Sequence, residues 1–302
     1  MKTKVMSMEE AVSRFVKDGD QIVIEGFTHL ICFAAAHEII RQRRRGLAVC
    51  RLTPDLIYDQ MIGAGCVRKL VFSWAGNPGV GPLYAFRRAV EQGVPNPLEL
   101  EEYSHYGMVA RFTAGAAKLP FYPLRNYMAS DLARVNPKIK RVACPFTGEE
   151  LAAVPALNPD TAIIHAQRAD RDGNAQIWGL IGVQKEAAFA ARNVIVVVEE
   201  IVAESLIRSD PNRTLIPGMI VKAVVEEPFG CHPSYAQGYY DRDNDFYISW
   251  REISKDVARF NSYLDEWVYG VRDRAEYVER MGSALAGLKA RSRPSAPVNY
   301  GY

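Results

Sequence analysis

A glycine-rich loop is the first part of the chain whose composition suggests chemistry. Residues 76–82 read Gly-Asn-Pro-Gly-Val-Gly-Pro, between a predicted strand over 70–74 and a predicted helix over 83–91. In a strand–loop–helix arrangement, backbone N–H groups can face an anion or the oxyanion of a reacting carbonyl. The loop matches neither the G-x-G-x-x-G nor the P-loop nucleotide motif. A plain Gly/Pro connection is the alternative. The residues predicted to contact substrate or oxyanion are Asn77, Gly79, Val80 and Gly81.

A second strand-to-helix turn has a similar character. Glu25-Gly26-Phe27-Thr28-His29 follows the apolar segment 21–25 and precedes a helix expected over 33–44. If both strands belong to one parallel sheet, the two turns lie at its carboxyl edge, where open α/β folds bind ligands. We therefore add Thr28 and His29 to the predicted substrate- and oxyanion-binding residues.

Two adjacent carboxylates end the very apolar segment 193–198. Neighbouring residues in a strand point to opposite faces, so Glu199 and Glu200 cannot share a proton as a catalytic dyad. We predict that they support the site as hydrogen-bonded strand ends, with a direct role left open. For His165 a satisfied core histidine is favoured over a base. The chain contains no G-x-S-x-G or H-E-x-x-H motif, so its own nucleophile is not evident.

Charge and cysteine content exclude several classes of protein. The formal net charge is only +2, so we expect no nucleic-acid partner. Five scattered cysteines without a C-x-x-C pair suggest neither a disulfide framework nor a metal site. The chain lacks an apolar run of membrane-spanning length, and the polar segment 1–7 lacks a signal-peptide core. A cytoplasmic location without membrane association is the expectation.

Short apolar segments alternate with helical patterns over much of the chain. Strands are expected over 21–25, 47–52, 70–74, 193–198 and 223–228, with helices over 8–16, 33–44, 55–62 and 83–91. Such alternation predicts an α/β protein of three layers, α/β/α, around a mostly parallel sheet. From Ile253 the pattern follows a 3.6-residue period. The predicted organisation is an α/β domain over 1–250, helices packed on it over 251–290, and a tail over 291–302.

Four motifs, in order, carry a resemblance to a known family. They are GDQIVIEGF, HAQRADRDGNAQIWG, LIPGMIVKAVVEEPFGCHPS and YYDRDNDFY. Together they resemble the family I coenzyme A transferases, most of all the A subunits of the glutaconate CoA-transferase type. The resemblance covers nearly the whole chain and implies the three-layer fold shared with sugar-phosphate isomerases.

The resemblance implies transfer of CoA from an acyl-CoA to a carboxylic acid. The family uses a glutamate nucleophile, which in members with two separate chains lies on the B subunit, in a Glu-Asn-Gly type motif. This chain has no such motif. We therefore expect no catalytic nucleophile in it, a partnering B subunit in a heterodimer or heterotetramer, and an acyl-CoA thioester as substrate with no permanently bound cofactor. Asp172-Gly173-Asn174 is expected to be a tight hairpin turn, with a ligand or partner contact as the alternative.

Two departures from the family pattern keep the chemistry open. Relatives acting on dicarboxylic substrates carry a basic Arg-Lys-Pro stretch after the first glycine turn, where this chain has Leu30-Ile31-Cys32. Pro78 stands where glutaconate-type enzymes have serine. Hydrolysis, C–C cleavage or decarboxylation of a CoA ester on the same fold is therefore an alternative to transfer, and a non-catalytic ligand-binding protein is a third. The aromatic cluster over 235–247 is expected at a subunit interface, or else over the chain's own sheet.

Overall fold

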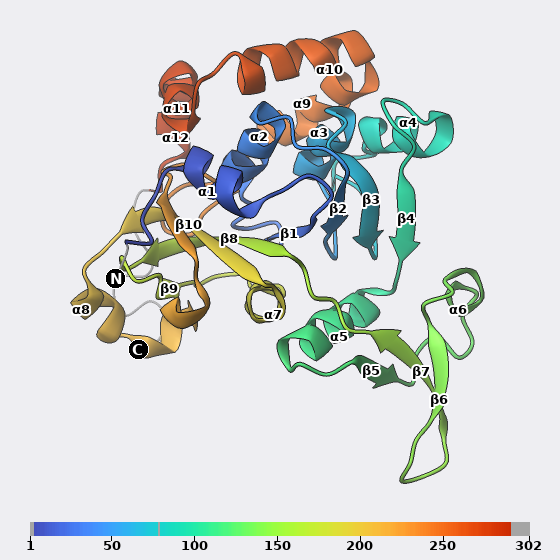
Figure 1. The fold of residues 1–302 in the computed structure, drawn as a ribbon. Coiled ribbons are helices and arrows are strands. Elements are labelled where there is room, and N and C mark those ends of the chain that lie inside the picture. Colours follow the sequence, from blue (N-terminus) through green and yellow to red (C-terminus); the bar gives the residue numbers. More distant parts are fainter. Residues whose placement is uncertain (1–2, 78, 291–302) are drawn as a thin grey trace.

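A seven-stranded parallel sheet organises the molecule (Figure 1). The computed structural model describes residues 3–77 and 79–290. The sheet order is β12-β10-β8-β1-β2-β3-β4. At the C-terminal end of β8, the short strand β9 pairs antiparallel with β8, and β11 pairs antiparallel with β9. The strands are β1 (Gln21–Glu25), β2 (Leu47–Cys50), β3 (Val67–Phe72), β4 (Glu99–Glu102), β8 (Thr161–Ala169), β9 (Ala175–Gln176), β10 (Asn193–Ile201), β11 (Thr214–Ile216) and β12 (Ala223–Glu226).

Helices cover both faces of this sheet, so the predicted three-layer α/β/α fold is confirmed (Figure 1). The longer central strands are buried along most of their length, as expected for a parallel sheet covered on both sides. The helices are α1 (Met8–Phe15), α2 (Phe33–Arg41), α3 (Leu56–Gly63), α4 (Tyr84–Gln92), α5 (His105–Ala116), α6 (Leu132–Val135), α7 (Gln184–Ala190), α8 (Glu204–Arg208), α9 (Asn244–Lys255), α10 (Val257–Leu264), α11 (Arg274–Met281) and α12 (Ser283–Leu288).

Strand β1 marks the point where the chain reverses its direction across the sheet. From β1 the chain passes to β2, β3 and β4 on one side, whereas β8, β10 and β12 lie on the other. In open α/β sheets, ligands bind outside the carboxyl ends of the strands at this switch point. The turn after β1 and the loop after β3 both lie at that carboxyl edge, as the sequence predicted.

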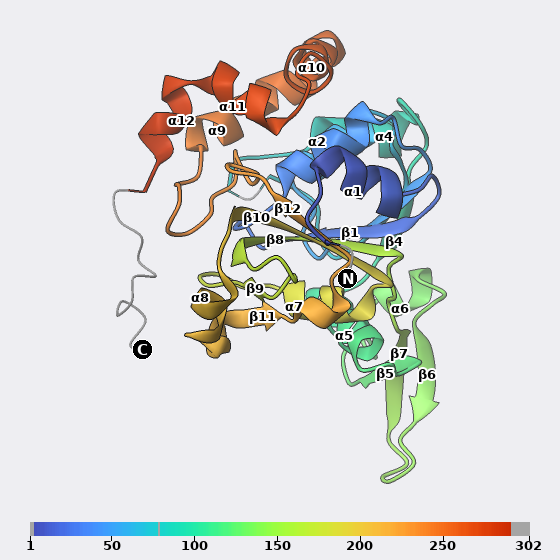
Figure 2. The same ribbon diagram turned by 60° about the vertical axis from the view of Figure 1, so that its left-hand side comes forward.

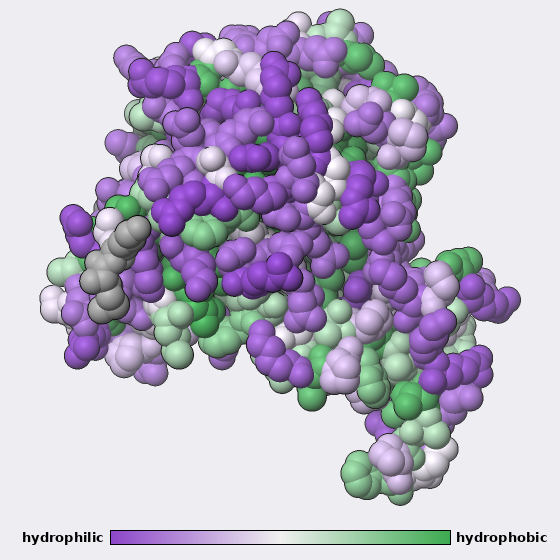
Figure 3. Space-filling model, in the orientation of Figure 1, coloured by the Kyte–Doolittle hydropathy of each residue, from purple (hydrophilic) through white to green (hydrophobic). Residues whose placement is uncertain are grey.

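An arm outside the main sheet was not foreseen from the sequence. The antiparallel strands β5 (Phe121–Leu124), β7 (Glu150–Pro155) and β6 (Lys140–Ala143) form a separate sheet that projects from the body (Figures 1 and 2). Apolar surface lies near its end (Figure 3), where Phe146 is 94% exposed. Cys144, in the same hairpin, is the one partly exposed cysteine among those described; the other four are buried.

The C-terminal pattern forms several short helices. α9 packs on α3 and α4, and Asp256 ends it and caps α10 by accepting a hydrogen bond from the Arg259 N–H at 2.8 Å. A π-helical turn over 265–269 follows. The boundaries at 250 and 290 stay predictions, and the predicted tail over 291–302 lies outside the described residues. No helix in the described part of the chain is long and apolar enough to cross a membrane.

Candidate active-site edge of the sheet

The turn after β1 is tightly folded and strained. Thr28 and Leu30 have φ angles of 57° and 55°, a left-handed conformation that few non-glycine residues adopt. A Cβ atom on Gly26 would lie 2.5 Å from the Leu30 carbonyl oxygen, so only glycine fits there. Backbone strain of this kind gathers at ligand-binding and catalytic sites.

His29 ties this turn to two other segments of the edge. Its Nδ1 lies 3.0 Å from the Leu180 carbonyl oxygen, and its Nε2 accepts a hydrogen bond from the Gln237 N–H at 3.0 Å. The hydrogen-bond pattern therefore assigns the proton to Nδ1. Burial lowers the pKa of His29 to about 4, so the ring is neutral at pH 7. Both ring nitrogens bind protein groups, and a substrate contact from His29 stays a prediction.

The glycine loop after β3 closes on itself. The Asn77 N–H donates to the Gly81 carbonyl at 3.0 Å, while the Val80 and Gly81 N–H groups donate to the Asn77 carbonyl at 2.9 and 3.2 Å. The N–H groups of three of the four predicted residues are therefore already used within the loop. Gly79 and Gly81 have φ angles of 76° and 133°, and a Cβ atom added at either would meet no atom within 4 Å. Both therefore face open space. Pro78 lies outside the described residues.

The segment that follows β2, over 51–55, joins the turn after β1 to the glycine loop after β3. Arg51 donates through Nη1 to the Ile24 carbonyl at 2.7 Å and through Nη2 to the Gly26 carbonyl, and its Nη2 lies 3.6 Å from Asp55. The Gly76 N–H donates to the Pro54 carbonyl at 3.1 Å. The turn after β1 and the loop after β3 are thus joined through the intervening β2 connection.

Glu25, the last residue of β1, is a buried carboxyl that the sequence reasoning passed over. Its side chain is 1% exposed, and Oε2 has no hydrogen-bond partner among the described residues. Burial raises the pKa of Glu25 to about 7, even though the Arg51 guanidinium lowers it. A charged residue ending the otherwise apolar run Ile-Val-Ile was the signal that could have identified it.

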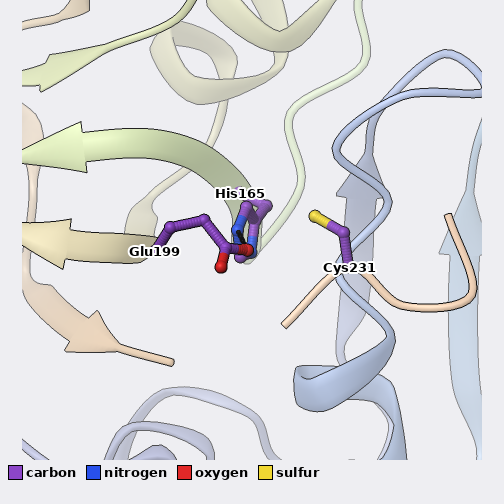
Figure 4. A group of neighbouring side chains, drawn as sticks. All are labelled: His165, Glu199 and Cys231. Atoms are coloured by element: carbon purple, nitrogen blue, oxygen red, sulfur yellow. Dashed lines mark hydrogen bonds and ion pairs between the residues drawn. The ribbon is translucent and has the colours of Figure 1, made fainter. Parts of the chain in front are cut away.

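Glu199 lies at the same edge, at the end of β10, in a hydrogen-bonded cluster (Figure 4). Its Oε1 accepts from His165 Nε2 at 2.9 Å and from the Tyr240 hydroxyl at 2.6 Å, and its Oε2 accepts from the Phe229 N–H at 2.7 Å. Glu200 accepts from the Tyr239 hydroxyl at 2.5 Å. The two carboxylates are hydrogen-bonded strand ends in the structure, and their functional role stays a prediction.

His165, Glu199 and Cys231 also have the residue types of metal ligands. One potential ligand atom from each lies within 4.8 Å of the others. Both Glu199 oxygens are already hydrogen-bonded, and burial raises the pKa of the Cys231 thiol well above its usual range, so it is protonated. A metal would have to displace these hydrogen bonds and the thiol proton. The cluster therefore fits a hydrogen-bonded core network better than a metal centre, and His165 Nδ1 is the atom of it that has no hydrogen-bond partner among the described residues.

The hairpin and two rings of the aromatic cluster contribute to the fold, and a ligand or partner contact from the hairpin or from the half-buried rings Tyr235, Tyr239 and Phe246 stays a prediction. Gly173 has a φ of 90°, and β8 pairs antiparallel with β9 across this turn, which confirms the predicted hairpin geometry. Asp170 Oδ1 accepts a hydrogen bond from the Asn174 N–H at 2.9 Å, so this carboxylate is hydrogen-bonded within the turn. Tyr240 and Tyr247 are each 2% exposed. These two rings therefore belong to the chain's own core and not to an exposed interface.

These features define an open α/β protein whose candidate site lies at the carboxyl edge of a parallel sheet, beside the switch point. The coenzyme A transferase family model matches residues 5–227. The chain belongs to the coenzyme A transferase family, as the sequence motifs predicted.

Known relatives of this chain include transferases and a decarboxylase. It is 54% identical to the A subunit of 3-oxoadipate CoA-transferase from Pseudomonas knackmussii, over 91% of this chain and 96% of the relative. The crystal structure of glutaconate coenzyme A-transferase from Acidaminococcus fermentans matches with a TM-score of 0.91 at 35% identity, over 95% and 96% of the two chains. The decarboxylase AibA/AibB matches with a TM-score of 0.73 at 31% identity, over 86% and 97%.

Proposed function

We propose that this chain is the A subunit of a heteromeric coenzyme A transferase that works in the cytoplasm. The observation that carries the proposal is its 54% identity, over nearly its whole length, to the A subunit of 3-oxoadipate CoA-transferase. Both 3-oxoadipate and glutaconate, in the names of its relatives, are acids with two carboxyl groups. We propose a dicarboxylic acid and the CoA ester of a dicarboxylic acid as the substrate class.

In the reaction that the family resemblance implies, the partner subunit supplies the nucleophile. There, the carboxylate of a glutamate attacks the thioester carbon, CoA leaves as a thiolate, and a mixed anhydride forms. The thiolate then attacks the glutamyl carbonyl and releases the first acid as its carboxylate, leaving a glutamyl-CoA thioester. The second acid repeats these steps in reverse order and leaves as the new acyl-CoA. CoA is thus a substrate, and no permanently bound cofactor is required.

Our proposal gives this chain the wall of the pocket that receives the acyl group. In this proposal the partner completes the site opposite the strained turn with Thr28 and His29 and opposite the loop at Gly79 and Gly81; the φ angles of the turn and the open Cβ positions of the two glycines support this. Preorganised backbone groups at such an edge can stabilise the oxyanion of the tetrahedral intermediates.

Reconstitution with the partner tests this proposal. The chain should be co-expressed with a candidate partner chain, and CoA exchange measured between 3-oxoadipate or glutaconate and succinyl-CoA. We expect exchange by the two-chain complex, none by this chain alone, and both chains in equal amounts by light scattering. Exchange at enzymatic rates by this chain alone would refute the split site.

Decarboxylation is the second candidate, because the decarboxylase AibA/AibB matches 86% of the chain at 31% identity. The two activities differ in their products. A decarboxylase releases CO₂ from an acyl-CoA without any acceptor acid, whereas a transferase consumes the acyl-CoA only when a second acid is present. Incubating the complex with the acyl-CoA alone therefore separates them.

A further inference from the structure

We propose that Glu25, in its protonated form, donates a hydrogen bond to the remote carboxylate of the dicarboxylic substrate. The inference rests on the proposed function and adds to it the group that recognises the substrate. It makes Glu25 a substrate-binding residue that confers specificity for a second carboxylate.

The position of Glu25 is the first argument. It ends β1, beside the switch point of the sheet, and continues directly into the strained turn. Its side chain is 1% exposed, and Oε2 has no partner among the described residues. Buried polar atoms are nearly always hydrogen-bonded, so the orphan Oε2 at this edge has a hydrogen-bonding position open to a ligand.

The charged surroundings of Glu25 supply no free cation. The titratable groups that face it are Arg51 and Asp55 on the β2 connection and Tyr58 on α3. Arg51 is committed to the Ile24 and Gly26 carbonyls and to Asp55. Tyr58 donates to the Ile24 carbonyl at 2.9 Å. Glu25 is therefore kept as a neutral acid by its burial, with a hydroxyl that can donate.

The side chains of the turn supply no cation for an anion. Leu30, Ile31 and Cys32 are apolar and fully buried, and both nitrogens of His29 are engaged. A carboxylic acid kept neutral by an apolar site can donate a hydrogen bond to a developing or resident anion. The side chains of the turn that can still donate to a substrate carboxylate are the buried Glu25 hydroxyl and the half-buried Thr28 hydroxyl, and of these two only Glu25 titrates near pH 7.

The way to this carboxyl passes the segment 179–182. A Cβ atom on Gly182 would lie 3.2 Å from Glu25 Oε1, so the backbone of this segment packs directly against the carboxyl. Leu180 and Ile181 beside it are each 44% exposed, and the Leu180 carbonyl is held by His29 Nδ1 at 3.0 Å. In the proposed complex this segment moves aside, so that the substrate carboxylate reaches Oε2.

Binding should therefore be linked to protonation. A carboxylate placed beside Glu25 raises the pKa of Glu25 further, because it disfavours a second negative charge. Above the pKa of the free protein, which is about 7, the complex must take up a proton. Affinity for the dicarboxylate then falls about tenfold for each further pH unit.

Substitution of Glu25 by glutamine, which can donate a hydrogen bond at any pH, and by methionine, which cannot, tests whether hydrogen-bond donation is its role. In the assembled two-chain complex, KM is compared for a dicarboxylic acid, glutaconate, and for crotonate, which lacks the remote carboxylate. We expect the wild-type KM for glutaconate to rise about tenfold per pH unit above pH 7, with a flat profile for crotonate. Glu25→Gln should abolish the slope. Glu25→Met should raise the KM for glutaconate at least about tenfold at pH 6 and leave that for crotonate unchanged.

The matched control is Glu227→Gln. Burial also raises the pKa of Glu227 to about 7, but its charged neighbours are Arg274 and Asp273. This variant should keep the wild-type pH profile. A slope that persists in Glu25→Gln, or that disappears in Glu227→Gln, would overturn the proposal, as would equal loss with both acids in Glu25→Met.

Calorimetry keeps this test distinct from that of the proposed function. Glutaconate binding at pH 8 is measured in two buffers of different ionisation enthalpy. We expect uptake of about one proton per site in the wild type and none in Glu25→Gln. A complex that transfers no CoA refutes the proposed function, whereas one that transfers CoA and binds glutaconate without proton uptake refutes the role of Glu25.

Discussion

Two buried glutamates at the same edge of the sheet have opposite surroundings. Glu25 ends β1 with one oxygen unpartnered, whereas Glu101 in β4 is surrounded by cations. Glu101 Oε1 lies 2.9 Å from Arg111, and its Oε2 lies 2.6 Å from Lys69 and 2.7 Å from Lys138. Burial would raise the pKa of Glu101, but Lys138, Lys69 and Arg111 together lower it to about 2. Burial raises the pKa of Glu25 to about 7.

The difference separates a structural carboxylate from one available for function. Glu101 joins β4 to α5 and to Lys138 at the base of the arm, and its oxygens have no capacity left for a ligand. Glu25 costs the fold free energy when it ionises, because burial disfavours its charge more than Arg51 and the backbone N–H groups of Gly26 and Val183 favour it. A protein retains such a group where another molecule can satisfy it.

The largest expected effect is on the stability conferred by Glu101. Glu101→Gln should lower the free energy of unfolding by about 3 kcal/mol, because it leaves buried cations without their counter-ion. Urea denaturation at pH 7 measures this. Glu99→Gln is the control, since Glu99 also lies 2.7 Å from Lys69 but is 59% exposed, and its loss should cost no more than about 0.5 kcal/mol. Equal effects of the two substitutions would show that Glu101 is not the centre of the network.

The stability effect at Glu25 should have the opposite sign. The folded-state pKa of about 7 lies above the ordinary value of 4.5, so ionisation destabilises the fold as pH rises through this range. Glu25→Gln should therefore gain about 3 kcal/mol over the wild type at pH 8 and nothing below pH 4.5. Thermal unfolding at both pH values checks this. A variant less stable than the wild type at pH 8 would mean that the Glu25 carboxylate is satisfied in the folded chain.

Glycine at position 26 should matter more for turnover than for folding. In Gly26→Ala the new Cβ would lie 2.5 Å from the Leu30 oxygen, so the strained turn must shift and displace the surroundings of Glu25. We expect kcat of the two-chain complex to fall about tenfold or more, as misplaced site groups do. Gly287→Ala in α12 is the control, because no atom lies within 4 Å of its Cβ position. Unfolding of Gly26→Ala, with normal turnover of the folded fraction, would assign the turn to structure alone.

The sequence predicted the sheet and the two loops because both depend on local patterns. Apolar runs such as 193–198 need cover on both faces, and glycines before helices mark the carboxyl edge. The orphan state of Glu25 could not be predicted, because it depends on what Arg51 binds instead and on how Gly182 packs against it. The arm was missed for a similar reason: its short strands carry little periodic signal, and their pairing joins residues about thirty positions apart.

The smallest effect on stability is expected for substitution of Cys144. Comparing the reactivity of Cys144 with that of Cys32 tests whether the turn after β1 stays closed in solution. Hydrogen bonds from Thr147 and the backbone lower the pKa of the Cys144 thiol, and the residue is partly exposed on the arm. Cys32, just after the strained turn, is fully buried, and burial raises the pKa of its thiol to about 12. Iodoacetamide should therefore label one thiol in each native chain, and Cys144→Ser should remove that labelling without a change in stability. Mass spectrometry locates the adduct. Rapid labelling of Cys32 instead would show that the turn opens on its own, and that the buried, neutral state of Glu25 does not persist in solution.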